Sequence, residues 1–128
     1  MPTAADYMTR DVIVLAPETG VHDAIRLLLE NDISGAPVVD ARGEVVGMLT
    51  GRDVIGAVFN ASYHKDLGGP VSAYMSRDVQ AVDAGAEVIE VIELFMKSPF
   101  RRFPVMSGTR LVGLISRRDV LRAIQELW

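Results

Sequence analysis

Two stretches of this 128-residue chain place a hydroxyl three positions before an aspartate, immediately after an apolar run that opens with glycine. They are GMLTGRDV, with Thr50 and Asp53, and GLISRRDV, with Ser116 and Asp119. Each hydroxyl falls where a strand should end and a helix begin. The free N–H groups of a helix amino terminus can hold a phosphate, and an ionised carboxylate can accept both hydroxyls of a ribose diol. The pattern therefore suits a nucleotide.

The same spacing also has a purely structural explanation. A hydroxyl followed three residues later by an acid is a close relative of the capping box, which satisfies the first free N–H groups of a helix. The pattern is short, false positives are frequent, and a duplicated helix needs its cap twice. Gly51 would allow close backbone approach in the first copy, where the second copy offers the charge of Arg117 instead. Both interpretations stay open at this point.

The two stretches belong to an internal repeat that covers the chain. AADYMTRDV near the start matches SAYMSRDV, which pairs Tyr7 with Tyr74 at an offset of 67. The same offset pairs Pro37 with Pro104, and one residue fewer in the next turn pairs Asp53 with Asp119. We therefore expect two domains, at residues 1–64 and 65–128, with the polar, Gly-rich stretch 61–70 between the copies.

Each copy predicts the same order of elements. An extended piece, 12–15 or 79–82, leads into an amphipathic helix whose apolar residues recur at helical spacing from Val21 or Val88. Thr19 is the candidate N-cap of the first of these helices. Two Val- and Ile-rich runs around a polar turn then predict a hairpin, and a second helix follows, at about 53–61 or 119–128. These β-α-β-β-α units predict an α+β fold, and a unit of about sixty residues is marginal alone.

The pattern G-h-h-[ST]-x-x-D after h-P-V-h, where h is apolar, together with Y-M-[TS]-R-D-V, resembles the cystathionine-beta-synthase (CBS) domain family. Two copies make the pair called a Bateman module. The resemblance implies two pseudo-symmetric units whose sheets pack face to face with flanking helices, and two clefts between them that bind adenosine-containing ligands. It also implies that Asp53 and Asp119 contact the ribose, with Thr50 and Ser116 near ribose or phosphate.

Carried over by position, the resemblance also implies which backbone and side chains frame each ligand. For the first copy these are Val12, Ile13, Val14, Ala36, Pro37, Val38 and Arg52, and for the second Val79, Gln80, Ala81, Phe103, Pro104, Val105 and Arg118. Arg101 and Arg102 precede the second Pro-Val, where the first copy has Ser34 and Gly35. The extra cations of the second copy favour a ligand with more phosphate charge there, although surface arginines are commonly just solvated.

Composition narrows the function classes. Apolar residues make up 49% of the chain and charged residues 23%, as in folded soluble domains. A net charge of −4 argues against nucleic-acid binding, and no apolar run approaches a membrane span. Cysteine is absent, and the two histidines lack a metal-ligand spacing, so we expect no metal site. No nucleophile motif is present, so we expect neither an enzyme nor a required cofactor.

The sequence thus predicts a cytoplasmic, stand-alone regulatory module that binds AMP, ADP, ATP or an S-adenosylmethionine-like ligand and signals, for example as an energy sensor, to a partner protein that it does not identify. The family resemblance and the apolar end of the last helix, Leu127-Trp128, predict a homodimer. The alternative is an interaction or scaffold dimer in which the hydroxyl–acid pairs only cap helices and no small molecule binds.

Overall fold

The computed structural model describes residues 1–60 and 67–128. The chain forms two compact units that do not follow simple chain order. The first unit is residues 13–79, and the second unit combines residues 1–12 with 80–128. The predicted boundary between residues 64 and 65 lies outside the described residues.

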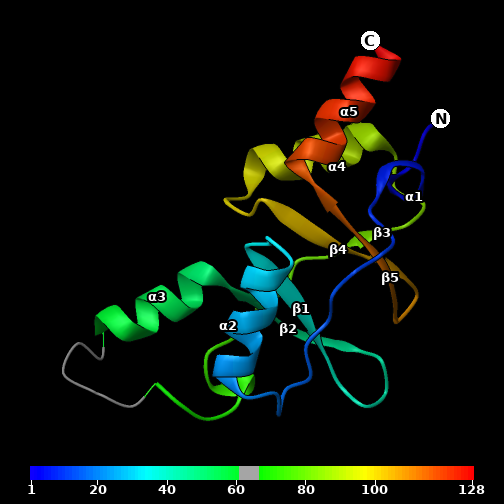
Figure 1. Cartoon of the computed structure of the whole chain (residues 1–128). Helices are drawn as coiled ribbons and strands as arrows, with labels where there is room; N and C mark the ends of the chain where they lie inside the picture. The colour runs from blue at the N-terminus through cyan, green and yellow to red at the C-terminus, as the bar shows by residue number, and fades with distance from the viewer. Residues whose placement is uncertain (61–66) are drawn as a thin grey trace. The chain divides into compact units, whose positions relative to one another are not determined.

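The first unit is built from a helix, a hairpin and a second helix (Figure 1). Its elements are α2 (Val21–Glu30), β1 (Gly35–Val39), β2 (Val45–Thr50), α3 (Gly51–Asn60) and the 3-10 turn η1 (Val71–Ala73). β1 and β2 are antiparallel, and Gly43 supplies the left-handed residue of their turn at φ 84°. α2 buries one face, and its residues join β1 and β2 in a single apolar core.

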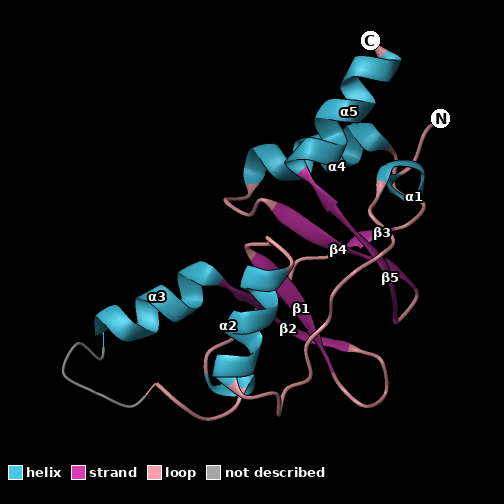
Figure 2. Ribbon diagram, viewed as in Figure 1, coloured by secondary structure: helices cyan, strands magenta, loops and turns pink. Residues whose placement is uncertain are grey.

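The second unit repeats this plan with a slightly larger sheet (Figure 2). Its elements are α1 (Ala4–Tyr7), β3 (Val82–Asp83), α4 (Val88–Lys97), β4 (Arg102–Ser107), β5 (Arg110–Ser116) and α5 (Arg117–Leu127). β3 runs parallel to β4, and β4 is antiparallel to β5. Phe103 lies at the centre of the core, fully buried, with the ring of Phe95 at a centroid distance of 4.6 Å.

The predicted α+β fold of two repeated units is confirmed, and the differences are local. The expected opening strands are short: Leu15 alone bridges to β1, and only Val82–Asp83 pairs with β4. The reason is a local turn, because the Val12 N–H donates to the Arg10 carbonyl at 3.1 Å and the Val79 N–H donates to the Arg77 carbonyl at 3.0 Å.

The expected N-cap at Thr19 is wrong. Gly20 is the N-cap of α2, and the Thr19 hydroxyl instead accepts from the Ala16 N–H at 3.1 Å inside the preceding turn. Because the Thr19 hydroxyl is hydrogen-bonded within the turn before the helix, it does not cap the first N–H groups of α2.

The opening segment of each repeat packs on the hairpin of the other repeat's unit. In the second unit, Thr9 and Leu114 exchange backbone hydrogen bonds of 2.7 and 2.9 Å, and Met8 lies in the core. In the first unit, Ser76 and Met48 exchange two bonds of 2.9 Å, and Met75 lies in the core. The Y-M-[TS] motif is therefore a docking segment, which explains why it recurs.

The glycine that opens each G-h-h-[ST] motif makes this docking possible. A Cβ added to Gly47 would lie 2.5 Å from the Met75 sulfur, and one added to Gly113 would lie 2.6 Å from the Met8 sulfur. Such distances are below any normal carbon contact, so the strand can receive the segment only where a side chain is missing.

Candidate functional site

The first hydroxyl–acid motif lies where β2 passes into α3. Asp53 Oδ2 accepts hydrogen bonds from the Thr50 N–H at 2.8 Å and the Thr50 hydroxyl at 3.0 Å. The Thr50 hydroxyl in turn accepts from the Asp53 N–H at 3.2 Å. Asp53 is half-buried. The pair forms a reciprocal cap on the helix, as the structural interpretation expected.

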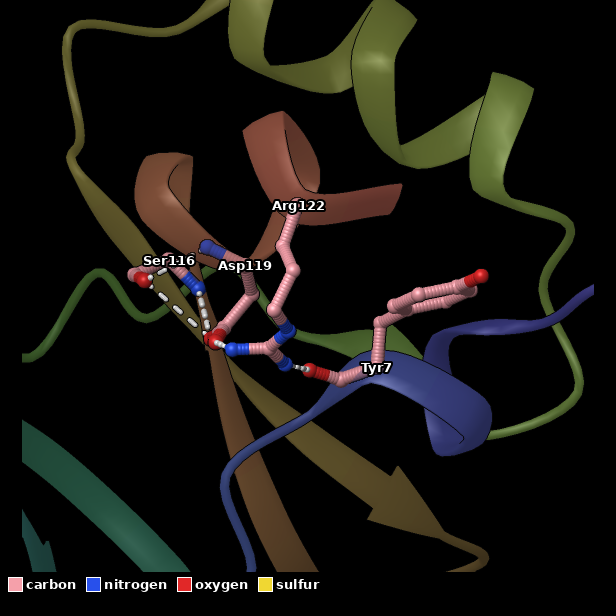
Figure 3. Close-up of polar contacts among 4 residues, drawn as sticks. All are labelled: Tyr7, Ser116, Asp119 and Arg122. Carbon is pink, nitrogen blue, oxygen red and sulfur yellow. Dashed lines mark hydrogen bonds and ion pairs between the residues drawn. The ribbon is translucent and has the colours of Figure 1, made fainter. Parts of the chain in front are cut away.

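The second motif has the same cap at the junction of β5 and α5 (Figure 3). Asp119 Oδ2 accepts from the Ser116 N–H at 2.9 Å and the Ser116 hydroxyl at 3.1 Å. In addition, Asp119 Oδ1 lies 3.3 Å from the Arg122 guanidinium, and the residue is only 4% exposed. Asp119 is thus bonded through both of its carboxylate oxygens.

A third pair at the start of the chain shows that this geometry is not specific to a ligand site. Asp6 Oδ2 accepts from the Thr3 N–H at 2.8 Å and the Thr3 hydroxyl at 3.2 Å, again as a capping box. This pair follows no strand. The hydroxyl protons of all three pairs are directed at their own carboxylates, so the spacing alone identifies a cap, and a ligand role needs further support.

Both units tie the residue before the h-P-V strand to the helix that carries the acid. The Gly51 N–H donates to the Ser34 carbonyl at 2.8 Å, and the Arg117 N–H donates to the Arg101 carbonyl at 3.2 Å. The sheet register sets Gly35 opposite Thr50 and Arg102 opposite Ser116. The structure therefore brings these segments to the same end of each hairpin as the acids.

The apolar residues assigned to the ligand are mostly part of the protein interior. Six of them, Ala36, Pro37, Val38, Phe103, Pro104 and Val105, are fully buried. Their backbone can frame a ligand, but most of their side-chain surface is already in the core. Such positions would set the shape of a site and not its polar contacts.

The remaining assigned residues lie beside the strand ends and are more exposed. Val12 belongs to the second unit and Ile13 and Val14 to the first, whereas Val79 belongs to the first and Gln80 and Ala81 to the second. Val14 is 46% exposed, and Ala81 lines an open groove of about 480 Å³ beside α4. The unit boundaries thus cut through both predicted groups.

The cations differ between the copies as the sequence indicated. Arg52, Arg101 and Arg118 are exposed, and Arg102 is half-buried. Burial lowers the pKa of Arg102, and the neighbouring Arg101 charge lowers it further. Two adjacent guanidinium groups at the start of β4 make that end of the second hairpin electropositive.

In the described residues 1–60 and 67–128, no three acidic or histidine side chains gather as a group that could hold a metal ion. His22 contacts the backbone carbonyl of Leu67 through Nε2. In the same ranges, no helix combines the length and apolar character that a membrane crossing requires.

Sequence reasoning missed Arg122 and its contact with the amino-terminal helix. Arg122 donates to the Tyr7 carbonyl at 3.0 Å (Figure 3). The Tyr7 hydroxyl donates to Glu126 at 3.4 Å. These side chains line an open groove of about 480 Å³ between α1 and α5, with Asp6 beside them. The spacing of Asp119 and Arg122 along a helix could have indicated their ion pair, but nothing in the sequence indicated that Arg122 also contacts Tyr7.

The chain belongs to the CBS domain family, whose model matches it twice, at residues 4–60 and 71–126. An uncharacterized 17.7 kDa protein of Acidianus ambivalens is 31% identical over 120 residues, covering 93% of this chain and 71% of the relative. Hypoxic response protein 1 of Mycobacterium tuberculosis is 29% identical over 127 residues, covering 98% of this chain and 87% of that protein.

Solved structures give the same assignment. CBSX2, a CBS-pair protein of Arabidopsis thaliana, superimposes in its complex with AMP with a TM-score of 0.87 at 28% identity. The match covers 99% of this chain and 98% of CBSX2. The chain is therefore a tandem CBS pair, and the two repeats detected in the sequence are its two CBS domains.

Proposed function

We propose that this CBS pair is a regulatory module that binds an adenosine-containing ligand at its hydroxyl–acid motifs and transmits the occupancy to a partner protein. The observation that carries the proposal is the likeness, over nearly the whole chain, to a CBS pair crystallised with AMP. AMP, ADP, ATP and S-adenosylmethionine-like molecules share the ribose diol and adenine that such a site would recognise. A cytoplasmic location fits a sensor of these metabolites.

The geometry of the motifs supports this proposal in two ways. The Gly51 and Asp53 N–H groups at the start of α3 donate to the Ser34 carbonyl and the Thr50 hydroxyl, but the positive end of the helix dipole still favours a phosphate there. The Asp53 carboxylate uses one oxygen for its cap, and an acidic side chain beside a helix start suits a sugar diol. A regulatory response further requires that the ligand bind one state of the module more tightly than another.

Exposed apolar side chains support a homodimer as the unit of function. α3 buries none of its residues, and Ile55 and Phe59 are 71% and 78% exposed. Trp128 at the end of α5 is 72% exposed. Large apolar residues gathered on helices are typical of association surfaces. Sedimentation equilibrium should give twice the chain mass, and a monomer at micromolar concentration would contradict this part of the proposal.

A scaffold dimer without a small-molecule ligand is the second candidate. It is favoured by one specific observation, namely that Thr3 and Asp6 form the same cap with no strand before them. In this alternative Asp53 and Asp119 serve α3 and α5 only as caps.

A thermal-shift panel with AMP, ADP, ATP, S-adenosylmethionine and NAD separates the two candidates. A ligand at 100 times its Kd stabilises the folded chain by about 2.7 kcal/mol. With an unfolding entropy of about 2.1 cal/mol/K per residue, this raises the Tm by roughly 10 °C. We expect at least one member of the panel to give such a shift.

The matched variants are a double change, Asp53→Asn with Asp119→Asn, and the control Asp6→Asn. Asparagine keeps one oxygen to accept the capping bonds but replaces the second acceptor oxygen, which a diol would use, by an NH₂ donor. The double variant should lose the ligand shift, and the Asp6 control should keep it. A parent chain that ignores the whole panel would favour the scaffold dimer instead.

A further inference from the structure

The two hydroxyl–acid motifs share their caps but differ in what the second carboxylate oxygen does. Asp119 Oδ1 lies 3.3 Å from an Arg122 guanidinium nitrogen. Asp53 Oδ1 takes part in no hydrogen bond or ion pair with any residue that the structure describes. The copies therefore present different surfaces to a ligand.

The two repeats differ in sequence at the position that decides whether the second carboxylate oxygen is paired. The offset that pairs Asp53 with Asp119 pairs Gly56 with Arg122, so the first copy has no side chain where the second has a guanidinium. Among the described residues, a Cβ at Gly56 would meet no atom outside its own helix backbone within 4 Å, which leaves open space one helical turn beyond Asp53. The first copy also has Gly35 opposite its hydroxyl, where the second has Arg102.

In the second copy, the ion pair belongs to a larger contact. Arg122 binds Asp119 with one nitrogen and the Tyr7 carbonyl with another, at 3.3 and 3.0 Å (Figure 3). Glu126, one turn further along α5, accepts from the Tyr7 hydroxyl at 3.4 Å. A ribose that took over Asp119 Oδ1 would have to displace a guanidinium that also holds α1.

We infer, on the basis of the proposed function, that Asp53 is the ligand-binding acid of this chain and that Asp119 is a positioning residue that Arg122 holds for the contact between α5 and α1. A half-buried acid whose second oxygen has no partner among the described residues can accept a diol without first losing a contact of that oxygen. An acid that is 4% exposed and already paired must first lose its partner, and an unpaired buried charge is costly. The chain therefore takes one adenosine ligand, through its first repeat.

Isothermal titration calorimetry with AMP, or with whichever panel member gave the shift, tests this inference. We expect one ligand per chain. Asp53→Asn should weaken binding by about tenfold or more, the loss of hydrogen bonds to a charged acceptor. Asp119→Asn should weaken it by less than about threefold, while lowering the Tm by about 3 to 6 °C because the Arg122 pair is lost.

A second pair of variants leaves both acids in place. Gly56→Arg introduces a guanidinium one turn from Asp53, as in the second copy, and Gly56→Gln introduces a long neutral side chain at the same position. We expect the Arg variant to bind AMP at least about fivefold more weakly than the Gln variant, because the ion pair competes with the diol.

The outcomes separate this inference from the proposed function. A parent chain that binds no member of the panel overturns the proposed function and this inference with it. Two ligands per chain, or a larger loss of affinity for Asp119→Asn than for Asp53→Asn, overturns the inference and leaves the proposed function standing. Equal affinities for the two Gly56 variants also count against it, even where an Asp variant fails to fold.

Discussion

Replacing Gly47 by alanine should destabilise the first unit through a clash with the docked segment. The added methyl would lie 2.5 Å from the Met75 sulfur and 2.9 Å from the Ser76 carbonyl oxygen. The Met75 side chain can rotate, but the Ser76 carbonyl is backbone and accepts from the Met48 N–H at 2.9 Å, while the Ser76 N–H donates to the Met48 carbonyl at 2.9 Å. Overpacking of this kind costs about 1 to 3 kcal/mol, and a strained backbone bond adds to it.

A cost of about 2 kcal/mol corresponds to a Tm lower by roughly 7 °C for a two-state chain of this length, at an unfolding entropy of about 2.1 cal/mol/K per residue. Thermal unfolding followed by circular dichroism measures this shift. The matched control is Gly56→Ala in the middle of α3, where an added methyl would meet no atom of the described residues within 4 Å apart from its own helix backbone. Alanine is the better helix former, so the control should raise the Tm slightly.

The result that would refute this reasoning is a Gly47→Ala chain as stable as the parent. It would mean that the Met75 segment does not sit on this strand in solution. A change in Tm equal to that of the Gly56→Ala control would point to the same conclusion. We expect only the Gly47 variant to lose stability, because only its methyl clashes with a neighbouring segment.

Three further predictions concern the second unit. Ser116→Ala removes the cap of α5 and should cost about 1 kcal/mol in urea unfolding; an unchanged midpoint would contradict the cap. Phe103→Ala should cost about 3 to 5 kcal/mol, because it empties a fully buried ring position, and near-UV circular dichroism would show the loss of packing. Partial burial and the Glu126 carboxylate raise the pKa of Tyr7, so its contribution to stability is complete below about pH 10 and is lost as the pH rises through the raised value. Tyr7→Phe should therefore make the alkaline loss of stability shallower in urea unfolding between about pH 8 and 11, and an identical slope would contradict the shift.

The sequence by itself identified the repeat, the hairpins and both pairs of helices, because these depend on local patterns. Apolar residues at helical spacing from Val21 and Val88 give amphipathic helices, and the Val- and Ile-rich runs on either side of a Gly turn give hairpins. The caps at Thr50 and Ser116 are also local, since their partners lie only three residues away. For the same reason the sequence could not separate capping from ligand binding.

The tertiary structure decided which repeat each segment joins. Residues 1–12 complete the second unit, because Met8 packs over Gly113, and the segment around Met75 completes the first over Gly47. The Arg122 contact with Tyr7 likewise joins residues 115 positions apart. Contacts at such separation depend on how the chain folds back, and neither a periodicity nor a short motif shows which two segments will meet. The sequence determined the elements, and close packing around two glycines determined which segments pair.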